Sequence, residues 1–255
     1  MEIKQISSAE NSYIKKLIKL KNKKYREEFG LFVAEGERSV KDAVASDFAV
    51  DAVVMTEAHY AEHESQFSCQ TVIVTTDKIF QQLCDTKTPQ GILAVLHMPK
   101  QPEKISGARY IYCDCIQDPG NAGTIIRSAD AFGFDGVVFS KGSVDVYAPK
   151  VIRSSMGSVF HIQMIADAED GFLERAKADG YFLSVTALHK DSVSLANGTF
   201  SDKQIFVIGN EGNGVSERVL ALADETVHIP MQGAAESLNA GVAASVLMYE
   251  VSRHE

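Results

Sequence analysis

The sequence lacks the segments that mark exported and membrane proteins. No apolar run approaches membrane-spanning length, and residues 1–5 are polar, whereas a secretory signal would have an apolar core. The composition, with 45% hydrophobic and 23% charged residues, is that of a soluble globular protein. We therefore predict a cytoplasmic protein with no membrane partner.

Cysteine is scarce and shows no metal-binding pattern. The four cysteines form no Cys-x-x-Cys pair, and no histidine cluster accompanies them, so we expect no bound metal. Cys113 and Cys115 lie two apart in a predicted strand, which would place both on one face as buried, reduced thiols. The chemistry of the chain is therefore expected to rest on other residue types.

The common nucleotide-binding loops are also missing. The strand predicted at 110–113 is followed by Asp118-Pro119-Gly120-Asn121 instead of Gly-x-Gly-x-x-Gly, so the Rossmann dinucleotide fingerprint is absent. No Gly-x-x-x-x-Gly-Lys-Ser/Thr phosphate loop occurs either. A Rossmann-type oxidoreductase is thus a remote alternative.

Positive charge is in short supply overall but not at the beginning of the chain. The net charge is −9 and the pI about 5.3. Residues 1–41 nevertheless hold ten Lys and Arg against six acids, whereas residues 106–255 hold eleven against nineteen. A basic beginning on an acidic body is expected where one region meets a polyanion. A solvated lysine-rich helix face would give the same pattern, so charge alone leaves both interpretations open.

The first half of the chain predicts a small α/β domain. Apolar residues at helical spacing, with lysines between them, predict one amphipathic helix over 11–29. Strands are then expected at 31–34, 50–55, 71–74 and 91–97, and helices at 37–45, 58–64 and 77–84. Such alternation is typical of α/β layers. Two prolines at 99 and 102 indicate a linker over 99–106, so we place one domain at 1–98 and another at 107–255.

The second half restarts the alternation and predicts a mostly parallel sheet with helices on both faces. Strands are expected at 110–113, 136–139, 159–164, 181–185, 205–208 and 226–229, and helices at 124–132, 146–157 and 172–178, with a final apolar helix near the end. Ligands of such sheets bind outside the carboxyl ends of the strands.

Two of these strand ends carry loops of small and polar residues. Residues 209–214 contain three glycines, which permit positive φ or close backbone approach, and residues 230–239 lead into a helix that begins with small residues. Either loop alone is also compatible with an ordinary strand, loop and buried helix. Arg127 lies on the first helix after a strand end, where its guanidinium could bind a phosphate or carboxylate. A surface ion pair with Asp130 or another nearby acid is the alternative.

Three segments together resemble the motifs of the SpoU (TrmH-like) RNA 2′-O-ribose methyltransferases of the SPOUT superfamily. They are Asn121-x-Gly123-x-x-x-Arg127, Gly209-Asn210-Glu211-Gly212-x-Gly214, and Ile229-Pro230-Met231 leading to Ser237-Leu238-Asn239. Their order and spacing match over about residues 108–250. One departure is Ala240-Gly241, where the family usually has Val-Ser. Residues 32–36 resemble, more loosely, the family's N-terminal RNA substrate-binding domain.

The resemblance implies a fold and a cofactor. We expect a C-terminal trefoil knot, a homodimer, and S-adenosylmethionine held bent in the knot. The implied cofactor contacts are Gly209, Glu211, Ile229, Met231, Leu238 and Asn239. No metal is needed, because the sulfonium is already an activated methyl donor and the enzyme must mainly align it with a ribose 2′-oxygen.

The resemblance also implies roles for side chains. The implied catalytic residues are Asn121, Arg127, Glu211, Ser237 and Asn239. Because a guanidinium stays protonated in proteins, our hypothesis is that Arg127 clamps a phosphate beside the target ribose, while the others orient the 2′-hydroxyl or the supporting loops. The candidate RNA contacts are Lys15, Lys19, Lys23, Arg26 and Arg38.

The substrate predicted from the resemblance is structured RNA, with 23S or other ribosomal RNA favoured over tRNA because of the N-terminal domain. A tRNA 2′-O-methyltransferase is an alternative. A catalytically silent relative that binds RNA or assists ribosome assembly is another.

Overall fold

The computed structural model describes residues 2–63, 69–102, 104–188 and 191–254. They form two compact units, Met1–Lys100 with Tyr147–Phe160, and Gln101–Val146 with His161–Glu255. The break after Lys100 lies inside the predicted linker. Residues 147–160 group with the first unit, although their position in the sequence had suggested the second domain.

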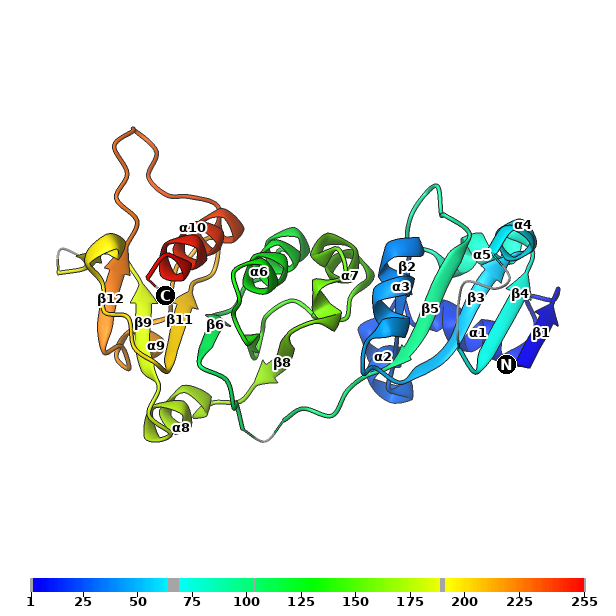
Figure 1. Cartoon of the computed structure of the whole chain (residues 1–255), viewed down its shortest axis with the longest axis horizontal. Helices are drawn as coiled ribbons and strands as arrows, with labels where there is room; N and C mark the ends of the chain where they lie inside the picture. The colour runs from blue at the N-terminus through cyan, green and yellow to red at the C-terminus, as the bar shows by residue number, and fades with distance from the viewer. Residues whose placement is uncertain (1, 64–68, 103, 189–190, 255) are drawn as a thin grey trace. The chain divides into compact units, whose positions relative to one another are not determined.

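The first unit is built on a five-stranded sheet of order β1-β4-β3-β5-β2 (Figure 1). Its elements are β1 (Glu2–Ile6), α1 (Ser12–Lys19), α2 (Lys23–Phe29), β2 (Leu31–Glu35), α3 (Glu37–Ala45), β3 (Val50–Thr56), α4 (Glu57–His63), β4 (Thr71–Thr75), α5 (Asp77–Leu83), β5 (Ile92–His97), α7 (Pro149–Ser155) and the 3-10 turn Ser158–Phe160. β1, β4 and β3 are parallel, while β5 is antiparallel to β3 and β2. The predicted helix at 58–64 has its last residue, Glu64, outside the described residues.

The single helix predicted over residues 11–29 is two helices. α1 ends at Lys19 and α2 begins after Asn22, whose side chain accepts a hydrogen bond from the backbone N–H of Lys24. An asparagine at this point favours a new N-cap over helix continuation. The carbonyl of Leu20, left free by the break, accepts a hydrogen bond of 2.6 Å from Arg26 Nη1.

The edge strand β1 was not predicted. Its residues are mostly exposed and polar, so the sequence carries no apolar alternation there. The strand forms because β4 offers a free edge, with which β1 pairs in parallel from Glu2 opposite Thr71 to Ile6 opposite Thr75. This is pairing set by tertiary context and not by local sequence.

The second unit has a seven-stranded sheet of order β10-β12-β9-β11-β6-β7-β8, and all of its described strand pairs are parallel. The strands are β6 (Arg109–Cys113), β7 (Gly136–Ser140), β8 (Gln163–Ala168), β9 (Phe182–Thr186), β10 (Val193–Ser194), β11 (Gln204–Ile208) and β12 (Glu225–His228). The helices are α6 (Pro119–Ala131), α8 (Phe172–Ala178), α9 (Glu217–Leu220) and α10 (Ala240–Ser252), with a 3-10 turn at Leu195–Asn197. The predicted α/β fold with a mostly parallel sheet is confirmed.

Helices cover both faces of this sheet, so its central strands are buried throughout. Every residue of β7 and β11 is buried. Tyr110, Ile205 and Val207 point to the face where α8 and α9 pack, as their shared apolar cluster with Leu173 and Val219 demonstrates. On the other face, α6 and α10 pack side by side (Figure 1). Buried apolar strands of this kind are typical of parallel sheets.

Several predicted boundaries in the second half were wrong. α6 begins at Pro119 and not at residue 124, because Asp118 caps it and proline fits the first helical position. The strand predicted at 159–164 is instead a 3-10 turn followed by β8 at Gln163–Ala168, and the helix predicted at 146–157 is confined to Pro149–Ser155.

The two neighbouring cysteines do not share a strand face. Cys113 is the last residue of β6 and is completely buried, which raises the pKa of its thiol well above the ordinary value. Cys115 lies beyond the strand with a φ of 57° and is only half-buried. The residues that the structure describes contain no group of three or more His, Cys, Asp or Glu side chains that could hold a metal ion. Among them, no helix is both long and apolar enough to span a membrane.

Candidate active site

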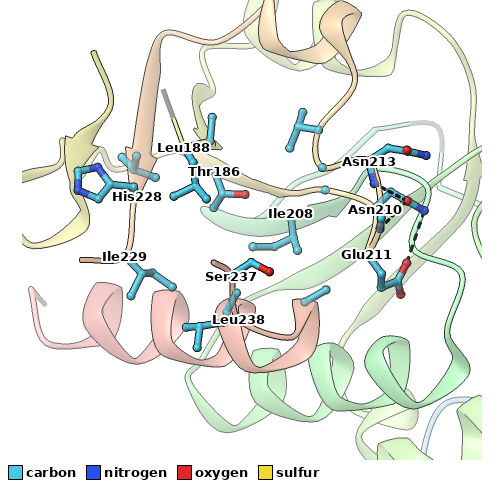
Figure 2. Close-up of a pocket in the computed structure, with 18 of the residues that line it drawn as sticks. Thr186, Leu188, Ile208, Asn210, Glu211, Asn213, His228, Ile229, Ser237 and Leu238 are labelled. Carbon is cyan, nitrogen blue, oxygen red and sulfur yellow. Dashed lines mark hydrogen bonds between the residues drawn. The ribbon is translucent and has the colours of Figure 1, made fainter. Parts of the chain in front are cut away.

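A pocket of about 540 Å³ lies in the second unit, where β9, β11 and β12 end (Figure 2). Its lining comes from residues 186–188 at the end of β9, 208–215 and 220 around the β11 loop, and 227–229 and 231 at the end of β12. Ser237, Leu238, Ala240 and Ala243, just before and at the start of α10, complete it. In Figure 2, Ile229 and Glu211 lie at opposite ends of the pocket, with Ile208 and Ser237 between them. The volume is that of a small-molecule site.

Two glycines shape the loop after β11 for different reasons. A Cβ on Gly209 would lie 2.3 Å from both the Gly214 carbonyl carbon and the Val215 nitrogen, so only glycine permits this close approach. Gly214 has a φ of +69°, which glycine adopts without strain. Gly212 needs neither property, since its nearest neighbour would be 3.6 Å away. The glycines at 209 and 214 therefore allow the two ends of the loop to approach each other closely.

Asn210 fixes this loop from inside, and sequence reasoning assigned it no role. Its Oδ1 accepts hydrogen bonds from the backbone N–H groups of Gly212 at 3.0 Å and Asn213 at 3.1 Å. Its Nδ2 donates to the carbonyl oxygen of Cys115 at 2.8 Å, which ties the loop to the segment that follows the neighbouring strand β6. An asparagine directly before Glu-Gly is a turn signal that could have revealed the first of these bonds.

Glu211 is held by donors from the segment after β6 and from the first turn of α6. Its carboxylate accepts hydrogen bonds from the backbone N–H of Gln117 at 3.2 Å and of Asp118 at 3.1 Å, and from Asn121 Nδ2 at 2.9 Å. Partial burial works against the charged form, but the hydrogen bonds from Asn121 and the backbone outweigh it and lower the pKa of Glu211 below its ordinary value. The carboxylate is therefore a fixed anion at the pocket.

Asn121 connects this carboxylate to the third motif. Its Nδ2 donates to Glu211, while its Oδ1 accepts a hydrogen bond of 2.9 Å from Asn239 Nδ2. Asn239 Oδ1 in turn caps α10 by accepting from the backbone N–H of Val242 at 3.2 Å. Asn121 is buried and forms no part of the pocket lining, and neither does Asn239. One chain of hydrogen bonds thus joins the three motif segments.

The remaining residues of the third motif lie at the pocket itself. Ile229, Met231, Ser237 and Leu238 all contribute to its lining (Figure 2). The Ala240-Gly241 departure has a packing consequence: a Cβ on Gly241 would be 3.1 Å from Thr124 Cβ, so glycine lets α10 approach α6 closely. Ser128 Oγ and Ser245 Oγ, 2.7 Å apart, complete this helix contact.

Arg127 is exposed on α6 and lies outside the pocket lining. In the part of the chain that the structure describes, its guanidinium makes no hydrogen bond or ion pair, and Asp130 pairs instead with His161 Nδ1 at 3.0 Å. The alternative of an Arg127–Asp130 ion pair is therefore wrong. The five N–H donors of Arg127 face solvent, available to an anionic ligand.

The predicted RNA contacts divide into exposed and buried groups. Lys15 forms an ion pair with Glu10, Lys23 with Glu27 at 3.6 Å, and Arg38 with Asp42 at 3.9 Å, all on the surface. Lys19 Nζ lies 5.1 Å from the centroid of the Tyr25 ring.

Arg26 is a correction to the predicted set. It is only 3% exposed, and its guanidinium is occupied with the carbonyl of Leu20. Arg26 therefore stabilises the corner between α1 and α2 and is not a surface contact.

Comparison with known proteins bears on the whole chain. Residues 108–249 match the model of the SpoU rRNA Methylase family, and residues 11–94 match the MRM3-like substrate binding domain. The chain is 36% identical over 250 residues to the 23S rRNA (guanosine(2553)-2′-O)-methyltransferase RlmP of Bacillus subtilis, an alignment that covers 98% of this chain and 99% of that protein.

Two solved structures resemble the chain along nearly its entire length. The SpoU methyltransferase AviRb from Streptomyces viridochromogenes, in complex with the cofactor AdoMet, has a TM-score of 0.86 at 30% identity and covers 96% of this chain and 98% of its own. An AdoMet-bound rRNA methyltransferase from Sinorhizobium meliloti has a TM-score of 0.87 at 27% identity, covering 99% and 98%. The resemblance predicted from the three motifs is thereby confirmed, and the chain belongs to the SpoU rRNA methylase family.

Proposed function

We propose that this chain transfers the methyl group of S-adenosylmethionine to the ribose 2′-hydroxyl of a structured RNA. The observation that carries the proposal is the chain of hydrogen bonds from Glu211 through Asn121 to Asn239, which joins all three family motifs beside one pocket. A methyltransferase mainly has to align two reactants, and a rigid set of loops provides that alignment. RlmP of Bacillus subtilis, which matches over nearly the whole chain, is named as a 23S rRNA 2′-O-methyltransferase, and the Sinorhizobium meliloti structure as an AdoMet-bound rRNA methyltransferase.

The pocket suits S-adenosylmethionine in shape and in chemistry. Ile208, Val227, Ile229 and Leu238 supply apolar walls for flat or aliphatic groups, and the 209–214 loop offers backbone groups at the rim. The Glu211 carboxylate, also in the lining, places a negative charge where a sulfonium cation can lie. We propose Gly209, Glu211, Ile229, Met231 and Leu238 as direct cofactor contacts, with Asn239 acting through its cap on α10. When bound, the cofactor supplies an already activated methyl group.

The side chains divide into positioning and reacting groups. Asn121 and Asn239 use their amides on each other, on Glu211 and on the α10 N-terminus, so we assign them the task of holding the loops. Ser237 lies in the pocket with a hydroxyl that can accept or donate to the ribose. Arg127, with free donors one to two turns along α6 from Asn121, would clamp the phosphate beside the target ribose.

Ribosomal RNA is the favoured substrate, and 23S RNA in particular. The first unit, which contains the match to a substrate-binding domain, supports this choice, as does the full-length similarity to a 23S rRNA enzyme. The exposed lysines of α1 and α2 would contact the RNA backbone. A tRNA substrate is the alternative, and the cytoplasmic location expected from the sequence stays a prediction.

We further propose a homodimer and a C-terminal trefoil knot. Leu238, Val242, Val246 and Tyr249 follow one another along one face of the last helix and its approach, and they are 37%, 47%, 38% and 53% exposed. An apolar stripe of this kind supports an interface between two copies. The knot is supported by the path of α10, which follows β12 yet packs against α6 beyond β11.

The test is to map 2′-O-methylated nucleotides by mass spectrometry in ribosomal and transfer RNA from cells with and without this gene. We expect one mark to disappear and to return with the intact gene but not with an Arg127→Ala variant. A mark lost from transfer RNA would reassign the substrate. No difference in either pool would support a silent RNA-binding relative instead.

A further inference from the structure

Two half-buried aromatic side chains lie among the lysines of α1 and α2 in the first unit. Tyr25 and Phe29, one turn apart on α2, stack with their ring centroids 5.9 Å apart and an interplanar angle of 24°. Both rings are half-buried. Phe29 packs partly against the apolar core, but Tyr25 is not part of that cluster. Core formation therefore accounts for Phe29 and leaves Tyr25 unexplained.

Three lysines surround this aromatic pair. Lys19 Nζ is 5.1 Å and Lys24 Nζ 5.9 Å from the Tyr25 ring centroid, and Lys16 Nζ is 5.2 Å from that of Phe29. Within the described ranges, none of the three has a carboxylate partner, unlike Lys15 and Lys23 beside them. Residues 12–29 hold six lysines and one arginine against two glutamates, in a chain of net charge −9. Three lysines without an acid partner among the described residues are thus gathered around two half-buried rings.

We propose that Tyr25 and Phe29 form a stacking platform for unpaired bases of the substrate RNA, with Lys16, Lys19 and Lys24 binding the adjacent phosphates. The inference rests on the proposed function, for which it names a point of RNA contact. Every base has a π-face, so aromatic rings flanked by cations bind single strands with little sequence preference. Bases inside a duplex are already stacked, so the platform selects loops, bulges and ends.

In the free protein the lysines occupy the ring positions that a base would take on RNA binding. An ammonium over a ring at the protein surface is weakly held, whereas its bond to a phosphate is charge-assisted. On binding, a base would take the place of the lysine on the ring while the lysine turns to the neighbouring phosphate. The rings are already stacked on a helix, so little order has to be gained when the RNA arrives.

The chain contains no tryptophan, which makes a direct optical test possible. In a full-length Tyr25→Trp variant, the single indole would sit on the proposed platform. We expect a short single-stranded RNA to quench its fluorescence in a saturable manner, and the same strand annealed to its complement to quench it much less. A Phe48→Trp variant is the matched control, because Phe48 is half-buried in the same unit but packs against Phe32 and Phe160.

Binding measurements separate stacking from charge. Replacing both rings by leucine retains apolar packing, and we expect the dissociation constant for single-stranded RNA to rise about tenfold, with an unchanged dependence on salt. Lys19→Gln should instead reduce the slope of log Kd against log salt by about one. A Tyr25→Phe variant should bind like the parent. Circular dichroism would verify that each variant is folded.

The outcomes distinguish this inference from the proposed function. An indole at position 25 that does not respond to bound single-stranded RNA, or a double leucine variant that binds as tightly as the parent, would overturn the platform. Methyl transfer with unchanged KM in that variant would do the same while leaving the proposed function intact. Conversely, quenching without any methyl transfer would retain the platform and reject the enzymatic function.

Discussion

The pocket of the second unit and the lysine-rich helices of the first hold their polar groups in different ways. At the pocket, Glu211, Asn121 and Asn239 are joined by hydrogen bonds of 2.9 Å that link three segments far apart in the sequence. On α1 and α2, Lys15 and Lys23 form exposed surface ion pairs with nearby glutamates. Fixed groups suit a reaction that depends on alignment, and exposed cations suit a flexible polyanion. Substitutions should therefore have much larger effects near the pocket.

Substitution of Arg127 should have the largest effect on methyl transfer, because its guanidinium is exposed and its N–H donors are free to bind a phosphate. We expect Arg127→Ala to lower kcat for methyl transfer by about 10²–10³-fold, by analogy with the loss of a group that stabilises a transition state. The dissociation constant for S-adenosylmethionine, measured by calorimetry, should not change, since Arg127 is outside the pocket lining. Arg175→Ala, an exposed arginine on α8, is the matched control. A near-normal rate with Arg127→Lys would rule out a bidentate clamp.

Gly209 and Gly212 offer a pair of otherwise similar positions in one loop. Gly209→Ala would force a Cβ to within 2.3 Å of the Gly214 and Val215 backbone, so the loop must shift. We expect a loss of about 1–3 kcal/mol in the free energy of unfolding and about 10²-fold in methyl transfer. Gly212→Ala, with 3.6 Å of space, should leave both nearly unchanged. Equal effects at the two positions would contradict the close-approach explanation.

Asn121 is the centre of the hydrogen-bond chain, so its removal leaves two partners unsatisfied. We expect Asn121→Ala to reduce the free energy of unfolding by about 1–3 kcal/mol, because the Glu211 carboxylate and the Asn239 amide each lose a bond. Urea denaturation would measure this. In a double-mutant cycle with Asn239→Ala, the double variant should lose less unfolding free energy than the sum of the two single variants' losses. Additive losses would mean that the two amides act independently.

Glu211 should make the stability of the protein depend on pH. Its pKa in the folded protein lies below the ordinary value of 4.5, through hydrogen bonds that outweigh the effect of burial. The stabilising contribution is therefore fully present above about pH 4.5 and is lost as the pH falls through the folded-state pKa. A Glu211→Gln variant lacks this titration. The stability difference between the two proteins should accordingly shrink below pH 4.5, and a difference that is constant with pH would refute the assignment.

Much of this site was predictable from the sequence because its residues are local signals. Gly209 and Gly214 are required by backbone geometry, and Asn121, Glu211 and Asn239 occur at fixed places within recognisable motifs. Their partnership was not predictable, because the bonds join residues about ninety or more positions apart, which only the folded sheet brings together.

The sequence predicted the first unit less well. The edge strand β1 depends on a neighbour that the sequence does not identify, and Arg26 looked like one more cation on a basic helix. Its burial follows from the break at residues 20–22, which Asn22 decides by capping a second helix. Helical periodicity alone does not distinguish one long helix from two consecutive helices whose apolar residues keep the same spacing.

The smallest effect is expected for a paired surface lysine in that first unit. Lys23 already forms an ion pair with Glu27 at 3.6 Å, so part of its charge is compensated before RNA binds. Lys23→Gln should weaken RNA binding by less than about threefold and reduce the salt slope by less than the value of about one expected for a full phosphate contact. Lys19, which has no acid partner in the described parts of the chain, is the matched comparison. If both variants changed the slope equally, existing ion pairs would not predict which lysines contact RNA. The contrast between the hydrogen-bonded pocket and the lysine-rich helices would then hold equally for every lysine on those helices.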